Sequence, residues 1–405
     1  MQTNLSEKFL NTPAGDKADK ILRACVHCGF CTATCPTYKL LGDELDGPRG
    51  RIYQIKQILE GQEPTARNRK HLDQCLMCRS CETTCPSGVR FSQLLEIGRT
   101  VVEPSAGRSW TESLVRSLLN KSLPYPNFYK VLYSLGLLFK PLLPRQLKKH
   151  LVPVQDITAG DAADSNSSFT KTLLLHQGCV QSVVTPETNK LASILFNRLG
   201  YQVKTINESG CCGAVSDHLL KHDDANAMMK RNIDAWWPSV ESGIDAILVN
   251  ASGCGVMLKE YGEKLADSAE YAEKAKIISS LVKDPVELLI DEDLGRLDIK
   301  VPDQKIAFHA PCTLQHGLKQ QGVVENLLTD LGFDLVEIQD SHLCCGSAGT
   351  YSIFQPEISN QLLSNKLEAI TRDNPDIVVT ANIGCQMHLQ SGLDKPVKHW
   401  ISLLV

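Results

Sequence analysis

The sixteen cysteines of this chain all belong to repeated patterns, which restricts what the chain can fold around. Eight form two runs with the spacing Cys-x2-Cys-x2-Cys-x3-Cys-Pro, and eight form two copies of a second pattern further on. An even number of cysteines also suits a disulfide framework, but such frameworks are typical of short secreted chains. This chain has 405 residues, and its first twenty lack the apolar core of a secretory signal. The patterns therefore indicate metal sites in a reducing compartment.

The two N-terminal runs have the spacing of bacterial ferredoxins, in which the fourth cysteine of each run serves the cluster of the other run. Thiolates are soft, anionic ligands that suit iron–sulfur clusters and zinc. Zinc ribbons need only Cys-x2-Cys pairs, so four cysteines per run exceed what zinc requires. The sequence therefore predicts two [4Fe–4S] clusters. Cluster 1 is assigned to Cys25, Cys28, Cys31 and Cys85, and cluster 2 to Cys75, Cys78, Cys81 and Cys35.

From Thr170 onward the chain repeats itself, and such repeats define architecture. The segments ending in Cys179 and Cys312 align, as do the two Cys-Cys-Gly turns and the segments ending in Cys254 and Cys385. The offset is 133 residues for the first two pairs and 131 for the third. Two equivalent half-domains follow from this.

Short apolar segments alternate with segments of helical periodicity in both halves, which predicts α/β units with parallel sheets. The predicted strands are Leu173–His176, Tyr201–Ile206, Ala246–Asn250, Ile306–His309, Leu335–Ile338 and Ile377–Thr380. Sites in such sheets form beyond the carboxyl ends of the strands. We therefore expect the cysteines of each half to meet at one sheet edge, and at least one half to hold a further iron–sulfur or metal centre. The alternative is that the cysteines are inherited in a domain that only docks partners. The candidate ligands are Cys179, Cys211, Cys212 and Cys254, then Cys312, Cys344, Cys345 and Cys385.

The expected fold class is α/β with a helical ferredoxin-like N-terminal module and two repeated α/β Cys-Cys-Gly half-domains. The predicted divisions are an N-terminal module at 1–106, a helical segment and linker at 107–168, a first half at 169–295 and a second half at 296–405. In the helical segment, prolines interrupt a leucine-rich pattern, which predicts short amphipathic helices. Residues 155–168 carry little apolar content and are expected to form an exposed linker.

The repeats resemble the cysteine-rich (Cys-Cys-Gly) domains of heterodisulfide reductase catalytic subunits and of the iron–sulfur subunits of anaerobic glycerol-3-phosphate dehydrogenase and lactate utilisation. In the fuller heterodisulfide reductase pattern the domain ends in Cys-x-x-Cys, whereas Met257 and His388 stand in place of the fifth cysteine here. Met257 is expected to pack, and for His388 a structural role is favoured over a ligand role. Four stretches resemble the iron–sulfur subunits of bacterial glycolate oxidases: Leu22–Pro36, Asp43–Arg51, Asn232–Pro238 and His342–Thr350.

This resemblance implies an electron-transfer subunit of an oxidoreductase complex. In such a complex a separate flavin subunit oxidises glycolate to glyoxylate, and electrons pass toward membrane quinone. The chain has no Gly-x-Gly-x-x-Gly fingerprint, so the flavin and substrate sites are expected on the partner, and no catalytic residue is assigned here. The alternatives are a subunit of a lactate or glycerol-3-phosphate dehydrogenase complex, or a heterodisulfide reductase-like enzyme. The missing fifth cysteine favours the relay over the disulfide-reducing enzyme.

Charge and hydropathy bear on location. A net charge of -4 gives no indication of nucleic-acid binding. The sequence contains no uninterrupted apolar run of about 18 residues, so no membrane span is predicted. The leucine-rich segment Val131–Leu143 precedes Arg145, Lys148 and Lys149, and an amphipathic segment with basic flanks can lie on a membrane. We therefore expect a cytoplasmic protein that is peripheral at the inner face of the cell membrane. The alternative is that these helices pack on the N-terminal module or on a partner.

Overall fold

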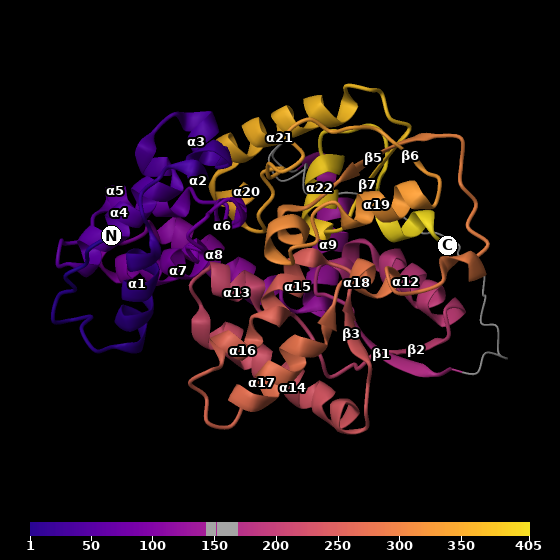
Figure 1. Cartoon of the computed structure of the whole chain (residues 1–405), viewed down its shortest axis with the longest axis horizontal. Coiled ribbons are helices and arrows are strands. Elements are labelled where there is room, and N and C mark those ends of the chain that lie inside the picture. The colour runs from indigo at the N-terminus through magenta and orange to yellow at the C-terminus, as the bar shows by residue number, and fades with distance from the viewer. Residues whose placement is uncertain (143–150, 152–168) are drawn as a thin grey trace.

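The computed structural model describes residues 1–142, 151 and 169–405 (Figure 1). The predicted linker at 155–168, and the basic residues Arg145, Lys148 and Lys149, lie outside the described residues. The remainder is a mixed α/β structure with parallel sheets, which confirms the predicted fold class. In Figure 1 the indigo N-terminal module lies at one end, and the two halves lie one above the other beside it.

The N-terminal module is helical. Thr12 begins the first helix by accepting a hydrogen bond from the Gly15 amide, and prolines begin two of the others. Isoleucines spaced along α4 are buried in the module core, as the helical periodicity predicts. The helices are α1 Pro13–Ala24, α2 Phe30–Ala33, α3 Pro36–Leu41, α4 Pro48–Leu59, α5 Ala66–Asp73, α6 Ser80–Thr83 and α7 Phe91–Ala106, with a 3-10 turn at Glu44–Asp46.

Two further helices follow the module, α8 Trp110–Ser122 and α9 Pro126–Leu138, and a 3-10 turn spans Lys140–Leu142. The break between them falls at the predicted proline interruptions, because Pro124 cannot continue a helix and Pro126 begins the next one.

Each half contains a four-stranded parallel sheet. The order in the first sheet is β2-β1-β3-β4, and in the second β6-β5-β7-β8. The strands are β1 Lys171–His176, β2 Tyr201–Lys204, β3 Ala246–Val249, β4 Val282–Lys283, β5 Lys305–His309, β6 Asp334–Leu335, β7 Ile377–Thr380 and β8 Val397–His399. The six predicted strands have counterparts, but β6 shares only Leu335 with the predicted strand Leu335–Ile338, because only Asp334 and Leu335 pair with β5. Strands β4 and β8 were not predicted. These two strands are so short that they carry no periodic pattern.

Helices cover the sheets in both halves. In the first half they are α11 Gln181–Val184, α12 Pro186–Arg198, α13 Ala214–His218, α14 His222–Glu241, α15 Ser252–Lys259, α16 Tyr261–Lys264, α17 Ala272–Leu281 and α18 Pro285–Leu289, with a 3-10 turn at Leu294–Arg296. In the second half they are a π-helix at Thr313–Gly317, α19 Val323–Asp330, α20 Tyr351–Phe354, α21 Pro356–Thr371 and α22 Ile383–Gln390, with a 3-10 turn at Trp400–Leu403. One apolar core joins both sheets, with Leu248 from the first and Val379 from the second.

The two halves meet directly after their central strands β3 and β7. The amide of Ser252 donates to the carbonyl of Ala381 (3.1 Å), and the amide of Gly253 donates to Oδ1 of Asn382 (3.1 Å). Cys254 and Cys385 come directly after these contacts. The carboxyl edges of the two sheets, where the cysteines were expected, therefore face a common interior.

The N-terminal module contacts both halves. It reaches the first half through ion pairs, Arg79 with Glu260 at 2.5 Å and Arg90 with Glu263 at 2.7 Å. The hydroxyl of Tyr351 in the second half donates to the carbonyl of Gln74 (3.0 Å). Cysteines from three separate stretches of chain are thereby brought toward one region.

Candidate metal centres

The two cysteine runs of the N-terminal module have the same backbone path. In both, the residue before and the residue after the second cysteine have positive φ: His27 (57°) and Gly29 (86°), then Met77 (54°) and Arg79 (63°). Three of these four are not glycine, so this curled path is a strained conformation that the surrounding structure must hold. Successive turns of this kind point backbone amides inward, where they can meet anionic sulfur.

Two small cavities bring the cysteines together in the predicted groups. One is lined by Cys25, Cys28, Cys31 and Cys85, with Cys81 at its margin, and the other by Cys35, Cys75, Cys78 and Cys81. In each group the fourth cysteine comes from the other run. This arrangement is what cross-ligation of two clusters requires.

The chemistry of these thiols suits a soft metal group. Burial, together with the neighbouring thiols of Cys25 and Cys28, raises the pKa of Cys31 to about 11. Burial likewise raises the pKa of Cys78 and Cys81 well above the ordinary thiol value. Thiolates crowded in this way are costly unless a cation offsets their charge, so the residues fit iron–sulfur clusters.

The two runs differ in exposure. Beside the first run, Cys28 is exposed, and so are its neighbours Val26 (67%) and Phe30 (60%). Beside the second run, Leu76 is buried among residues of the second half that include Cys344. Cluster 1 would therefore face outward and cluster 2 inward.

A buried polar network supports the second group. The hydroxyl of Thr37 lies 3.3 Å from Sγ of Cys35, and Nη1 of Arg51 donates to that hydroxyl (3.1 Å). Arg51 also donates to the carbonyl of His71 (2.7 Å) and pairs with the buried Asp46 (3.4 Å). Arg51 thus ties two stretches of chain around Cys35.

The Cys-Cys-Gly turns have the same geometry in both halves. Gly213 has a φ of 94° and Gly346 a φ of 93°, and each amide donates to Sγ of the first cysteine of its turn (3.4 Å). A Cβ on Gly346 would lie 2.6 Å from the carbonyl oxygen of Ser359, so only glycine fits there. The turns hold adjacent thiols at the sheet edge as the repeat predicts.

In the first half the four predicted cysteines are neighbours. Hydrogen bonds from Cys179 and from Cys212 lower the pKa of the Cys211 thiol, in that order of effect. A hydrogen bond from Cys212 likewise lowers the pKa of Cys254. All four side chains are at most partly exposed, and Cys211 is fully buried. The structure therefore brings this set together.

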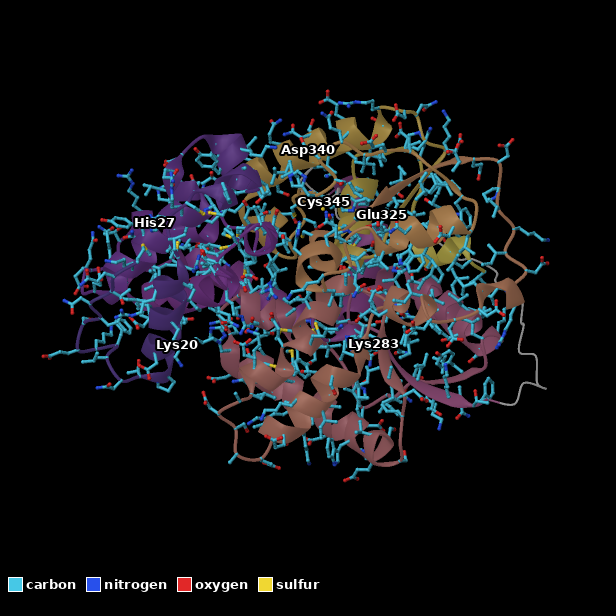
Figure 2. The ribbon with its side chains drawn as sticks, viewed as in Figure 1. Lys20, His27, Lys283, Glu325, Asp340 and Cys345 are labelled. Atoms are coloured by element: carbon cyan, nitrogen blue, oxygen red, sulfur yellow. The ribbon has the colours of Figure 1, made fainter. Side chains whose placement is uncertain are left out.

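In the second half, Sγ of Cys312 lies 3.8 Å from Sγ of Cys344. Cys345 and Cys385 lie near each other and near His309, with the ligand atoms of these three residues within 4.8 Å of one another. Figure 2 labels Cys345 in the interior of this half, and His27 in the N-terminal module. This set is also gathered as expected.

Two histidines at these sites escaped the sequence reasoning. His176 and His309 end β1 and β5, three residues before Cys179 and Cys312, and they share the 133-residue offset of the repeat. That shared position is the signal that could have revealed them. Met257 packs in the apolar core as predicted, and His388 is buried with Nε2 3.3 Å from the Ser359 hydroxyl.

A cavity of about 930 Å³ connects the three parts of the chain. Tyr129, Leu132 and Tyr133 of α9 line one side of it. The cysteines that line it are Cys78, Cys179, Cys211, Cys212, Cys254, Cys312, Cys344 and Cys385. The inward-facing cysteine run and both sheet edges thus open onto one shared cavity.

Comparison with known proteins matches a family to the N-terminal module and another to both halves. A family described as "4Fe-4S dicluster domain" matches residues 21–89, and "Cysteine-rich domain" matches residues 173–259 and 306–390. The chain is 50% identical to the glycolate oxidase iron-sulfur subunit of Escherichia coli (strain K12) over 404 residues, which cover 100% of this chain and 98% of the relative. It is 29% identical to a probable glycolate oxidase iron-sulfur subunit of Bacillus subtilis (strain 168), over 92% of this chain and 89% of the relative. Lactate utilization protein A of Shouchella clausii (strain KSM-K16) is 25% identical over 56% of this chain and 95% of the relative.

Proposed function

This chain belongs to the family of glycolate oxidase iron–sulfur subunits, and on that premise we propose that it carries electrons from a flavin subunit that oxidises glycolate to glyoxylate toward membrane quinone. Glycolate oxidation releases two electrons and two protons, and quinone reduction takes up the same number, so the overall reaction balances. The chain is then one subunit of an oxidoreductase, and the substrate site belongs to the flavin subunit.

The main support for this function is that the cysteine groups follow one another from the surface to the interior of the protein. Cys28 is exposed at one end, and Cys78 lies beside the second half at the other. Burial is the main cause of the raised pKa of the Cys78 thiol. The neighbouring Cys312 is the second cause, because the two thiols lie close together. When bound, iron–sulfur clusters accept and release electrons one at a time.

The ligand assignment within this proposal follows the cavity linings. Cys25, Cys28, Cys31 and Cys85 would hold cluster 1, and Cys75, Cys78, Cys81 and Cys35 cluster 2. The four cysteines of each half would hold a further metal centre. The divisions at residues 106, 168 and 295 remain our proposal for the domain limits, and each described sheet lies inside one half.

The flavin subunit would dock where the first cysteine run reaches the surface. Val26 and Phe30 are large apolar side chains on either side of the exposed Cys28, and a partner covering them would approach cluster 1 closely. Exposed apolar residues beside a redox group favour a protein partner over water at that position.

Peripheral attachment to the membrane is supported by α8 and α9. None of the described helices is long and apolar enough to cross a bilayer. These two helices nevertheless expose Leu118, Val131 and Leu138 to water, and Lys121 and Lys130 are exposed beside them. An apolar face with lysines suits an anionic lipid surface. Because the opposite side of α9 lines the large cavity, a membrane quinone would reach the cysteine edges over a short path.

The deciding experiment is reconstitution of the native complex. We would purify the tagged chain anaerobically with the flavin protein it retains, add glycolate, and follow the visible absorbance of this chain and reduction of a soluble quinone. Bleaching that depends on both glycolate and the flavin partner is expected. If the chain alone reduces disulfides, and glycolate never bleaches it in the complex, the disulfide-reductase alternative is correct instead.

A further inference from the structure

We propose that His309 and its repeat counterpart His176 supply nitrogen ligands to the metal centres of the two halves, so that each set combines thiolate and imidazole. This inference rests on the proposed function in one respect, namely that the halves hold metal. The ligand class is new, because the cysteine pattern alone gives four thiolates per half.

The geometry in the second half carries the inference. His309 is 2% exposed, and its Nε2 has no hydrogen-bond partner among the described residues. A buried ring nitrogen without a partner is costly, so it calls for an explanation. The ligand atoms of His309, Cys345 and Cys385 lie within 4.8 Å of one another, which places a ring nitrogen of His309 beside two of the predicted thiol ligands.

The other ring nitrogen of His309, Nδ1, already has a hydrogen-bond partner. Nδ1 of His309 lies 3.1 Å from the hydroxyl of Thr380, at the end of the neighbouring strand β7. If Nδ1 carries the proton and donates it to Thr380, Nε2 keeps its lone pair and is available to a metal. Histidines that bind metals usually have such a partner on the second nitrogen, because it sets the tautomer and the ring orientation.

The first half has a histidine at the equivalent position, although its neighbouring strand β3 ends in Val249 where β7 ends in Thr380. His176 is 2% exposed at the same position on β1, and its ring is within interaction range of the Cys254 thiol. The edge of its ring meets Trp236, with the centroids 5.8 Å apart, so the ring is held in place.

The combination of imidazole and thiolate ligands limits which metals the site can hold. Imidazole and thiolate together suit iron and zinc, whereas magnesium and calcium prefer oxygen. A neutral nitrogen adds no negative charge to a site that already gathers four thiols, which lowers the cost of burying the set. Imidazole in place of thiolate is also known to raise the potential of an iron–sulfur centre.

The test uses the anaerobically purified full chain, wild type and His309→Ala, with His388→Ala as the matched control from the same half. Metal and acid-labile sulfide are measured per chain. If the extra metal is iron, pulsed EPR of protein labelled with ¹⁵N-histidine is recorded. If it is zinc, X-ray absorption at the zinc edge is recorded.

The expected result is a histidine nitrogen signal in the wild type that His309→Ala reduces and His388→Ala leaves unchanged. Thr380→Val, which removes only the orienting hydroxyl, should keep the metal and alter the signal; it also serves if His309→Ala does not fold. A metal-loaded wild type without a nitrogen signal would overturn the histidine assignment while leaving the metal centre intact. Absence of any metal beyond the two N-terminal clusters would overturn the centre itself.

Discussion

At the scale of single residues, the metal sites depend on backbone positions that few side chains can occupy. The two Cys-Cys-Gly glycines have φ near 94°, a left-handed conformation in which a Cβ meets a neighbouring carbonyl. Their amides point at the first thiol of each turn as a result. Glycine in this motif is therefore part of the thiol environment, because it sets the direction of the amide.

The prediction for this turn compares two glycines that both have positive φ. In Gly346→Ala the new Cβ would lie 2.6 Å from the Ser359 carbonyl, whereas in Gly349→Ala nothing lies within 4 Å. Both variants carry the left-handed cost of about 1–2 kcal/mol, and only Gly346→Ala adds the clash. We expect the urea midpoint to fall in both variants but clearly further in Gly346→Ala, and metal to be lost from the second half in Gly346→Ala alone. Equal losses in the two variants would contradict the steric argument.

A second residue-scale prediction concerns Asp284, which caps α18 by accepting from the Val286 amide (3.1 Å). Burial raises the pKa of Asp284 to about 7, from a usual value of about 3.9. Because the folded pKa is raised, its stabilising contribution is complete below about pH 3.9 and is lost as pH rises through about 7. Asp284→Asn keeps the capping acceptor but cannot ionise. Its stability relative to wild type should therefore rise from pH 5 to pH 8 in urea unfolding.

The control for that measurement is Asp293→Asn. Asp293 also caps a turn, by accepting from the Gly295 amide (3.1 Å), but it is exposed. Its effect should not change between pH 5 and pH 8. A pH-independent difference for both variants would show that Asp284 is not ionising in the folded protein over this range.

At the scale of elements, the N-terminal module is held by a buried charge network as well as by apolar packing. Arg51 on α4 is 1% exposed, and it joins the Cys35 region to the end of α5 through His71. Removing one member of a buried pair leaves the other charge without compensation, which costs about 3–5 kcal/mol. Exposed pairs contribute little by comparison.

Arg51→Met should therefore destabilise the module strongly, by about 3–5 kcal/mol, and loosen the Cys35 group. Arg23→Met is the matched control, because Arg23 pairs with Asp19 at 2.7 Å on the surface and should cost about 0–1 kcal/mol. Urea unfolding and iron content check both variants. A small effect from Arg51→Met with full iron content would mean that the network is not needed to hold the module.

At the scale of the whole molecule, much of the organisation follows from local patterns in the sequence. The cysteine spacing and the strand–helix alternation are local, so they predicted the cysteine groups and six strands, of which β6 was placed too far along the chain. Strands β4 and β8 depend on pairing with β3 and β7, which no periodicity in so few residues can reveal. The sequence did not predict His309 as a ligand, because a histidine at the end of a strand cannot be distinguished by its pattern from any other core residue. The exposure of Phe30 depends on how the module meets the halves, which is a tertiary property.

If the flavin subunit docks beside Cys28, a charge on that surface should weaken electron transfer into this chain. Phe30→Glu places a charge on the exposed face beside Cys28, where Phe30 is 60% exposed. We expect glycolate-driven bleaching of the complex to slow at least tenfold, with unchanged iron content. Trp110→Glu, at another exposed aromatic residue (76%), is the control and should leave bleaching unchanged. Normal bleaching in Phe30→Glu would place the flavin subunit elsewhere.

The membrane proposal is tested on the face formed by α8 and α9. Leu118 is 58% exposed and Leu138 is 71% exposed, so replacing both with glutamate removes apolar area and adds charges that anionic lipid repels. We expect the wild type to float with vesicles rich in phosphatidylglycerol, less with phosphatidylcholine, and less at high salt because salt screens the lysines. The double variant should bind at least tenfold more weakly, while Ile277→Glu, at an exposed residue of α17 (41%), should bind as the wild type does. If the variant floats normally but loses the flavin subunit on purification, this face binds a protein partner and the membrane assignment is wrong.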